Sequence, residues 1–221
     1  MVQQRHEMYR LVHKALRHTL YTTSRSLGIA DFRDDGVAGE AVGGLERSIT
    51  LLEAHAMHEE KYVHSQIKSK APDLVASLEK DHQNDNKVYT ELRRLSQEAG
   101  NATGDRKAAL GGEIYEKYNE FVGEYLGHMV IEEGEMQQVL WDNFTDDELG
   151  AIDDAIMANV PPELMAQILP DFCGGLNPDE LSFTLGGLKA VAPPEMFAGV
   201  VQMAAQATPS QNWEKVKARI A

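Results

Sequence analysis

The sequence has little cysteine, no long apolar run and no glycine-rich phosphate loop. Its single cysteine, Cys173, cannot form an internal disulfide, and no cysteine pair is available for a structural zinc ion. Charged residues interrupt the apolar runs well short of the ~18 residues that a membrane span requires. The N-terminus also lacks the apolar stretch of a signal peptide. These absences predict a cytoplasmic protein with no membrane segment.

Basic charge is scarce as well. The chain of 221 residues has 21 Lys and Arg against 35 Asp and Glu, a formal net charge of −14. Sequence-independent nucleic-acid binding relies on Lys and Arg to neutralise phosphates, so we expect no nucleic-acid partner. Because a GxSxG nucleophile motif is also missing, the sequence predicts no nucleophilic catalytic residue.

The sequence does contain one motif twice. His55-Ala-Met-His-Glu59 and His128-Met-Val-Ile-Glu132 each place a glutamate four residues after a histidine. On an α-helix, residues four apart lie on the same face, so each motif predicts an imidazole and a carboxylate able to bind one cation. The spacing alone is weak evidence in a chain with 8 His and 35 acidic residues, so the surrounding pattern has to decide.

Both motifs fall on the apolar faces of predicted helices. The faces follow i+3 and i+4 steps and comprise Leu45, Ile49, Leu52, His55, Ala56, Glu59 and Val63 in one helix and Ile114, Tyr118, Phe121, Tyr125, His128, Glu132 and Val139 in the other. Because an unpaired charge is costly to bury, histidine and glutamate at such positions indicate a buried site with compensating charge.

Two further histidines lie on apolar stripes: His13 with Tyr9, Leu16, Leu20 and Leu27, and His82 with Leu78, Asp85, Leu92 and Leu95. One inward histidine is more often a hydrogen-bonded core residue, but four of them with two carboxylates favour a metal. Such ligands inside a helical bundle suit iron, manganese or zinc, and such bundles can hold two ions. The predicted ligands are His13, His55, Glu59, His82, His128 and Glu132.

Some positions stay open. Asp85, at i+3 from His82, is a possible oxygen ligand, with a solvated acid as the equal alternative. Glu133 is the alternate to Glu132, although five residues place it about 140° around the helix from His128 and four residues only about 40°. Three further histidines lie off the apolar stripes and are predicted to be solvated or just outside the ligands: His18, His58 and His64.

The order of these elements resembles the hemerythrin-like family, also called HHE cation-binding domains, over approximately residues 5–143. The segments that carry the resemblance are Val-His13-Lys-Ala-Leu-Arg, His55-Ala-Met-His-Glu59-Glu60, Glu79-Lys-Asp-His82 and His128-Met-Val-Ile-Glu132-Glu133. The resemblance implies an up-down four-helix bundle with two non-haem iron ions, bridged by the carboxylates and capped by the histidines. It also implies binding or sensing of dioxygen, nitric oxide or peroxide, or the handling of iron.

One position departs from the oxygen-carrying members of that family. They have a second histidine four residues after the one on the third helix, where this chain has Asn86, so an open metal position is expected. Whether the protein turns over a small oxidant as an enzyme is left open. A different alternative is a helical interaction module whose buried His/Glu network is satisfied by hydrogen bonds without metal.

The chain is predicted to be all-α, with the bundle in residues 1–143 and a C-terminal extension of short helices in residues 144–221. Bundle helices are expected over about 4–28, 38–70, 72–99 and 105–142. The extension contains a repeat offset by 32 residues, in which residues 147–149 and 161–166 recur as 179–181 and 193–198. Each copy predicts a helical hairpin with prolines at helix starts. Its apolar faces suggest packing on the bundle or a homo-oligomer through these helices.

Overall fold

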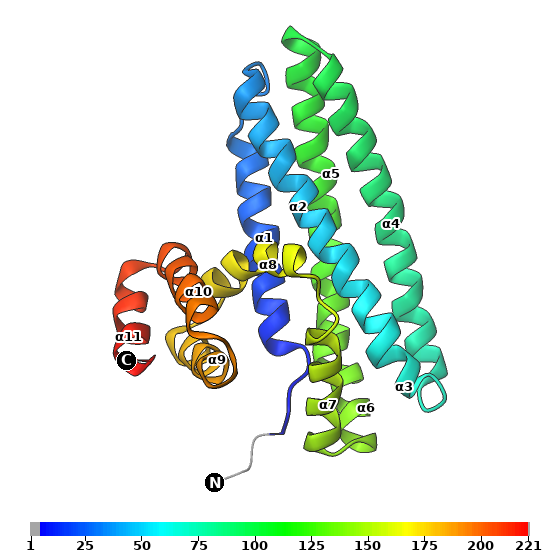
Figure 1. Ribbon diagram of the computed structural model, residues 1–221. Coiled ribbons are helices and arrows are strands. Elements are labelled where there is room, and N and C mark those ends of the chain that lie inside the picture. Colours follow the sequence, from blue (N-terminus) through cyan, green and yellow to red (C-terminus); the bar gives the residue numbers. More distant parts are fainter. Residues whose placement is uncertain (1–4, 221) are drawn as a thin grey trace. The chain divides into compact units, whose positions relative to one another are not determined.

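The computed structural model describes residues 5–220, in which every regular element is a helix and no strand occurs (Figure 1). The contacts divide the chain into two compact units. The first comprises the described residues up to Tyr9 together with Leu20–Asn159, and the second comprises Arg10–Thr19 together with the residues from Val160 onward. No helix within residues 5–220 combines the length and the apolar character that crossing a membrane requires.

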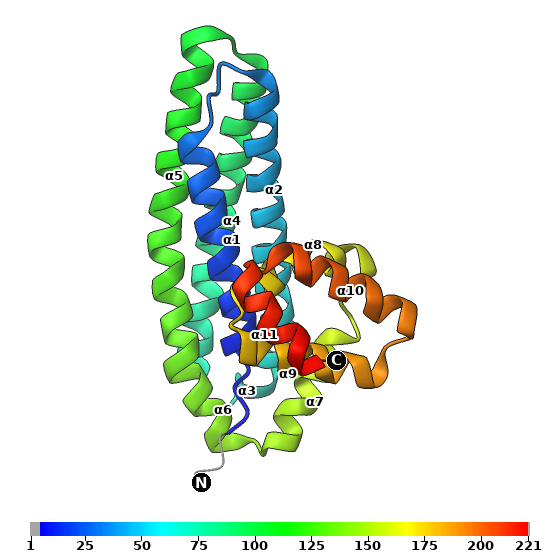
Figure 2. The ribbon, with the colours of Figure 1, turned by 90° about the vertical axis from the view of Figure 1, so that its left-hand side faces the viewer.

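The first unit is built on long helices that lie side by side (Figures 1 and 2). Its elements are the second half of α1 (Arg10–Ile29), α2 (Asp35–His58), η1 (Glu59–His64), α3 (Ser65–Ile67), α4 (Pro72–Asn101), α5 (Gly104–Ile131), η2 (Glu132–Met136), α6 (Gln137–Asn143) and α7 (Asp146–Met157). The start of α4 at Pro72 follows from the proline, whose missing N–H costs nothing in the first helical turn.

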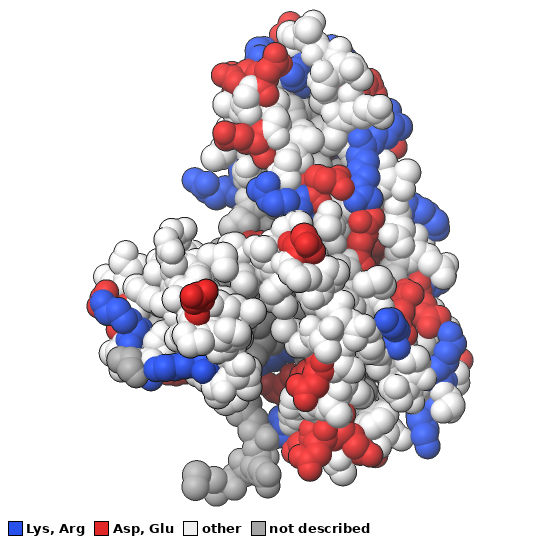
Figure 3. Space-filling view, in the orientation of Figure 1, with Lys and Arg blue, Asp and Glu red and all other residues white. Residues whose placement is uncertain are grey.

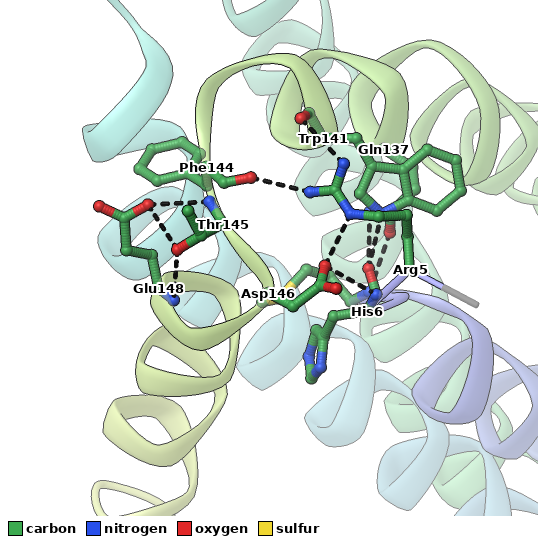
Figure 4. A network of polar contacts seen from close by, with 9 residues as sticks. Arg5, His6, Gln137, Trp141, Phe144, Thr145, Asp146 and Glu148 are labelled. Atoms are coloured by element: carbon green, nitrogen blue, oxygen red, sulfur yellow. Dashed lines mark hydrogen bonds and ion pairs between the residues drawn. The ribbon is translucent and has the colours of Figure 1, made fainter. Parts of the chain in front are cut away.

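The first helix begins at Arg10, so its predicted start at residue 4 is wrong for residues 5–9, and residue 4 itself lies outside the described residues. Side chains near the α6–α7 junction form hydrogen bonds with backbone groups of His6, which a longer helix would use for its own hydrogen bonds (Figure 4). The Asp146 carboxylate accepts the His6 N–H at 3.1 Å, and the Trp141 indole N–H donates to the His6 carbonyl at 2.7 Å. The Arg5 guanidinium adds an ion pair to Asp146.

Helix α7 starts at a hydroxyl cap. Thr145 accepts the Glu148 N–H, and the Glu148 carboxylate in turn accepts the Thr145 N–H (Figure 4). Leu149 then packs into a core cluster with Val63 and Ile67. The contacts group α7 with the first unit, which extends to Asn159. The predicted domain division between residues 143 and 144 stays a prediction.

Two of the predicted long helices are each interrupted by one turn of π-helix, η1 and η2. The Ser65 N–H donates to the Glu60 carbonyl, and the Gln137 N–H donates to the Glu132 carbonyl, in both cases five residues earlier. Such turns insert one extra residue into an α-helix and occur frequently at functional sites. They bring residues five apart onto one face, which the 3.6-residue period of an α-helix does not do.

The second unit has its own core. Its helices are α8 (Pro162–Gly175), α9 (Pro178–Val191), α10 (Pro194–Ala207) and α11 (Ser210–Ile220). Three of them start with proline, as predicted, and Asn177 caps α9. Its buried side chains are Cys173, Leu176, Leu181, Leu185, Val200, Ala204 and Val216. Burial raises the pKa of the Cys173 thiol to about 11.

A close contact in the first unit makes a stability prediction. Gly111 of α5 lies under the buried Phe32 ring, and an added Cβ would lie 2.4 Å from two of the ring carbons. At the adjacent Gly112 a Cβ would meet nothing within 4 Å. We expect Gly111→Ala to lower the free energy of unfolding by about 1–3 kcal/mol through overpacking. Gly112→Ala should instead raise it by roughly 0.5–1 kcal/mol. Denaturant unfolding of both variants measures this, and equal effects would contradict the contact.

Candidate metal centre

The repeated motifs supply two of the buried acids of the first unit. Among the residues described, the buried acids are Glu59, Asp85 and Glu132. Glu59 and Glu132 each start one of the π turns, and the exposed fractions of the two residues are 3% and 0%. On the face shown in Figure 3, acidic and basic side chains are interspersed over the surface. The overall acidity of the chain is therefore a separate matter from these inward carboxylates.

The two glutamates are shared by two sets of potential ligand atoms. Glu59, His82, His128 and Glu132 offer atoms that all lie within 4.8 Å of one another, and so do His55, Glu59 and Glu132. A cation holds nitrogen and oxygen ligands at about 2 Å, so ligands of one ion lie within roughly 4 Å of each other. One carboxylate oxygen of Glu59 lies 3.0 Å from His55 Nε2, and the other lies 3.5 Å from His82 Nε2. This arrangement suits carboxylates that bridge two cations.

The histidine nitrogens also face one another. His82 Nε2 lies 3.2 Å from His128 Nε2, which is itself 2.9 Å from a Glu132 oxygen. The Nδ1–H of His82 donates to Glu60 at 3.0 Å, and that of His128 donates to Asp81 at 3.4 Å. In neutral imidazoles of this tautomer, each Nε2 carries a lone pair, so two lone pairs would meet. A cation between them, or a proton on one of them, removes the conflict.

Glu60 and Asp81 are candidate site residues that the sequence analysis did not identify. A carboxylate on the outer nitrogen of a metal-binding histidine orients the ring and raises its basicity. Each lies directly beside a predicted ligand in the sequence, Glu60 after Glu59 and Asp81 before His82. That adjacency was the available signal, but the helical period alone does not show that the two side chains reach histidines of other helices.

The same contacts shift the titration of the histidines. Burial by itself would lower the pKa of His128, but the hydrogen bond and charge of Glu132 outweigh it and raise the pKa to about 9. The pKa of His82 is raised in the same way by Glu59 and Glu60, against the effect of burial. Without metal, these contacts therefore favour protonation of the two histidines.

Two histidines predicted to be solvated or just outside the ligands are buried. His58 is 7% exposed and His64 is fully buried, so a solvated position is wrong for both. For His64 the reason is the π turn η1, which starts at Glu59 and brings the residue five positions later to the inner face. Burial lowers the pKa of His64, which favours a neutral ring. His18 lies in the second unit and is partly exposed, close to Asp171.

The two positions that the sequence left open, Glu133 and Asp85, have different environments. Glu133 is exposed, whereas Glu132 is buried. Asp85 is buried and lines a cleft of about 120 Å³, but it belongs to neither set of ligand atoms. The cleft also has His82 and Asn86 in its lining, together with Glu53, Ala56, Met57, Glu60 and Tyr89. Burial raises the pKa of Asp85 to about 6. The cleft thus provides a polar opening beside His82.

His13 is the remaining predicted ligand. It is fully buried on α1, within the segment Arg10–Thr19 that the contacts group with the second unit. Its role as a ligand stays a prediction, and the geometry described above rests on residues of the first unit alone.

Buried phenols accompany the carboxylates. The Tyr125 ring lies 5.7 Å from the His128 ring, and the phenol is 2% exposed. Burial, with the charges of nearby groups that include Glu59 and Glu132, raises the pKa of Tyr125 well above its ordinary value. Tyr9 is affected in the same way. Both phenols therefore stay protonated and can donate hydrogen bonds at neutral pH.

The outer carboxylates generate a prediction about metal affinity. Replacing Glu60 with Gln or Asp81 with Asn keeps the size of the side chain but removes the charge that orients a histidine. Changes of this kind cost about 10–100-fold in metal affinity. Titration of the metal-free protein with ferrous or zinc ions measures the change. Glu91→Gln, at a surface ion pair with Arg94, is the matched control and should leave the affinity unchanged.

A second prediction concerns the pH dependence of the metal-free protein. Because the folded-state pKa of His128 is raised, its contribution to stability is present below pH ~6.5 and is lost as the pH rises through about 9. The free energy of unfolding of the chelated protein should thus fall over this range by at most about 3 kcal/mol from this group. Urea unfolding at several pH values should show a smaller fall for His128→Gln. Parallel curves would contradict the pairing with Glu132.

Comparison with known proteins adds no family assignment. No protein-family model matches this chain, and no match was found among curated proteins or among solved structures. The case for a metal site accordingly rests on the residues and distances given above.

Proposed function

We propose that this chain is a hemerythrin-like protein with an up-down four-helix bundle that holds two iron ions. The observation that carries the proposal is the sharing of Glu59 and Glu132 between two sets of ligand atoms. Two carboxylates that each serve two cations, with histidines at both ends, form the ligand pattern of dinuclear sites in helical bundles. Manganese or zinc would also suit these ligands.

The residues of the proposed site would have three roles. His82 and His128 would bind one ion and His55 the other, with His13 as the predicted further ligand of the second ion. Glu60 and Asp81 hold two of the rings by their outer nitrogens. Iron bound here would supply reversible change between ferrous and ferric states, and direct binding of dioxygen, nitric oxide or peroxide.

The cleft beside His82 gives such a molecule a way in. Asn86 lines it, where oxygen-carrying members of the family have a further histidine. No second imidazole from this turn of α4 then fills the metal position, which leaves it for a small ligand. Whether the protein consumes the oxidant is decided by turnover: an enzyme needs a reductant and cycles, whereas a sensor or carrier reacts stoichiometrically.

A metal-free interaction module is the second candidate. It is favoured by one observation, the 2.9 Å contact between His128 Nε2 and a Glu132 oxygen, because an imidazolium–carboxylate pair can satisfy a buried network by itself. In that case the two glutamates would serve only the stability of the fold. The two candidates differ in what removal of the carboxylate charge does to metal content.

The deciding experiment is the metal content per chain after purification under reducing, oxygen-free conditions, with absorption spectra before and after adding air. We expect about two iron ions per chain and a new near-ultraviolet absorption in air. The double variant Glu59→Gln, Glu132→Gln should lose the metal. Glu133→Gln is the matched control, because it changes the exposed neighbour of Glu132 and should keep it. A wild-type protein that holds no metal and gains none from ferrous iron would overturn the proposal and favour the module.

A further inference from the structure

His64 is a buried histidine of the first unit that is not among the proposed ligands. Its side chain is fully buried, and neither ring nitrogen has a hydrogen-bond partner among the residues described. A buried polar group without a partner costs about 1–3 kcal/mol. Such groups in native proteins usually mark a bound water, an ion or a functional role.

The position of His64 points toward the candidate metal centre. The turn η1 starts at Glu59 and ends at His64, so the extra residue of the π turn brings both onto the inner face. The His64 ring lies parallel to the His82 ring, with an interplanar angle of 6° and a centroid separation of 5.8 Å. The charges of Glu59 and Glu132 also act on it.

His64 nonetheless stands apart from the ligands themselves. It belongs to neither set of atoms that lie within 4.8 Å of one another. A histidine that is buried beside His82 but belongs to neither ligand set suits contact with a molecule bound at the centre better than contact with the cation.

We propose that His64 is the hydrogen-bonding partner of the small oxidant, and that it favours hydrogen peroxide. The proposal rests on the function proposed above. A neutral imidazole has one N–H donor and one nitrogen acceptor. The nitrogen that faces the bound molecule is a donor in one tautomer and an acceptor in the other. Hydrogen peroxide can bond to it in either tautomer, whereas dioxygen and nitric oxide can only accept. His64 is therefore a residue that touches and orients the ligand, rather than a seventh metal ligand.

Azide, a small anion that accepts hydrogen bonds, is a suitable probe for the iron-loaded, oxidised protein. His64→Leu removes both nitrogens and should raise the dissociation constant of azide at least about tenfold, the value of one hydrogen bond. His64→Gln keeps a donor and an acceptor and should recover part of the affinity. His58→Leu, the same change at a buried histidine of the preceding turn, is the control and should leave the azide affinity unchanged.

Two further readouts do not depend on affinity. The azide stretching band of the wild-type protein should shift on transfer to D2O, and His64→Leu should abolish the shift. The reduced His64→Leu protein should also react more slowly with hydrogen peroxide than the wild type, with a smaller change for dioxygen.

The outcomes separate this inference from the proposed function. If the wild-type protein holds two irons and His64→Leu binds azide as tightly and with the same D2O shift, the inference is wrong and the di-iron proposal stands. If His64→Leu or His64→Gln folds but loses iron, His64 is a metal ligand and the inference is likewise wrong. If the wild-type protein holds no iron, both proposals fall.

Discussion

Two carboxylates buried between helices are the constraint on which the first unit depends. Glu59 and Glu132 lie almost entirely out of water, and an uncompensated charge in such a place costs several kcal/mol. Compensation comes from the histidines of α2, α4 and α5, whose side chains converge on the two glutamates. Packing of apolar residues brings these helices together. The contacts between histidines and glutamates then constrain how far each helix is shifted along its neighbours.

The two π turns have the same arrangement at the two buried glutamates, one in each half of the site. Each starts at a buried glutamate and places the residue five positions later on the inner face: His64 after Glu59, and Gln137 after Glu132. Gln137 binds backbone groups of the N-terminal segment, accepting the Met8 N–H and donating to the His6 carbonyl. His64 has no such partner among the residues described, and the two halves therefore differ in how this inward side chain is hydrogen-bonded.

Two partly exposed carboxylates that are not in the ligand sets hydrogen-bond to buried histidines. Glu60 is about half exposed and Asp81 is partly exposed, yet each holds the outer nitrogen of a buried histidine. Because their charges remain close to water, their desolvation costs little. They determine which nitrogen of each ring faces inward, and so convert two core histidines into potential ligands.

The sequence alone was sufficient for the helical class, for most helix starts and for the inward faces that carry His55, Glu59, His82, His128 and Glu132. These features depend on local physics: the 3.6-residue period, prolines and hydroxyl caps at helix starts, and the cost of burying charge. The positions of Glu60, Asp81 and His64 were decided only by the tertiary structure. The first two act across helices, and the third depends on a π turn that changes the period by one residue and that the pattern of apolar residues does not reveal. The start of α1 at Arg10 was likewise a tertiary result, because side chains of α6 and α7 bind the backbone groups that precede it.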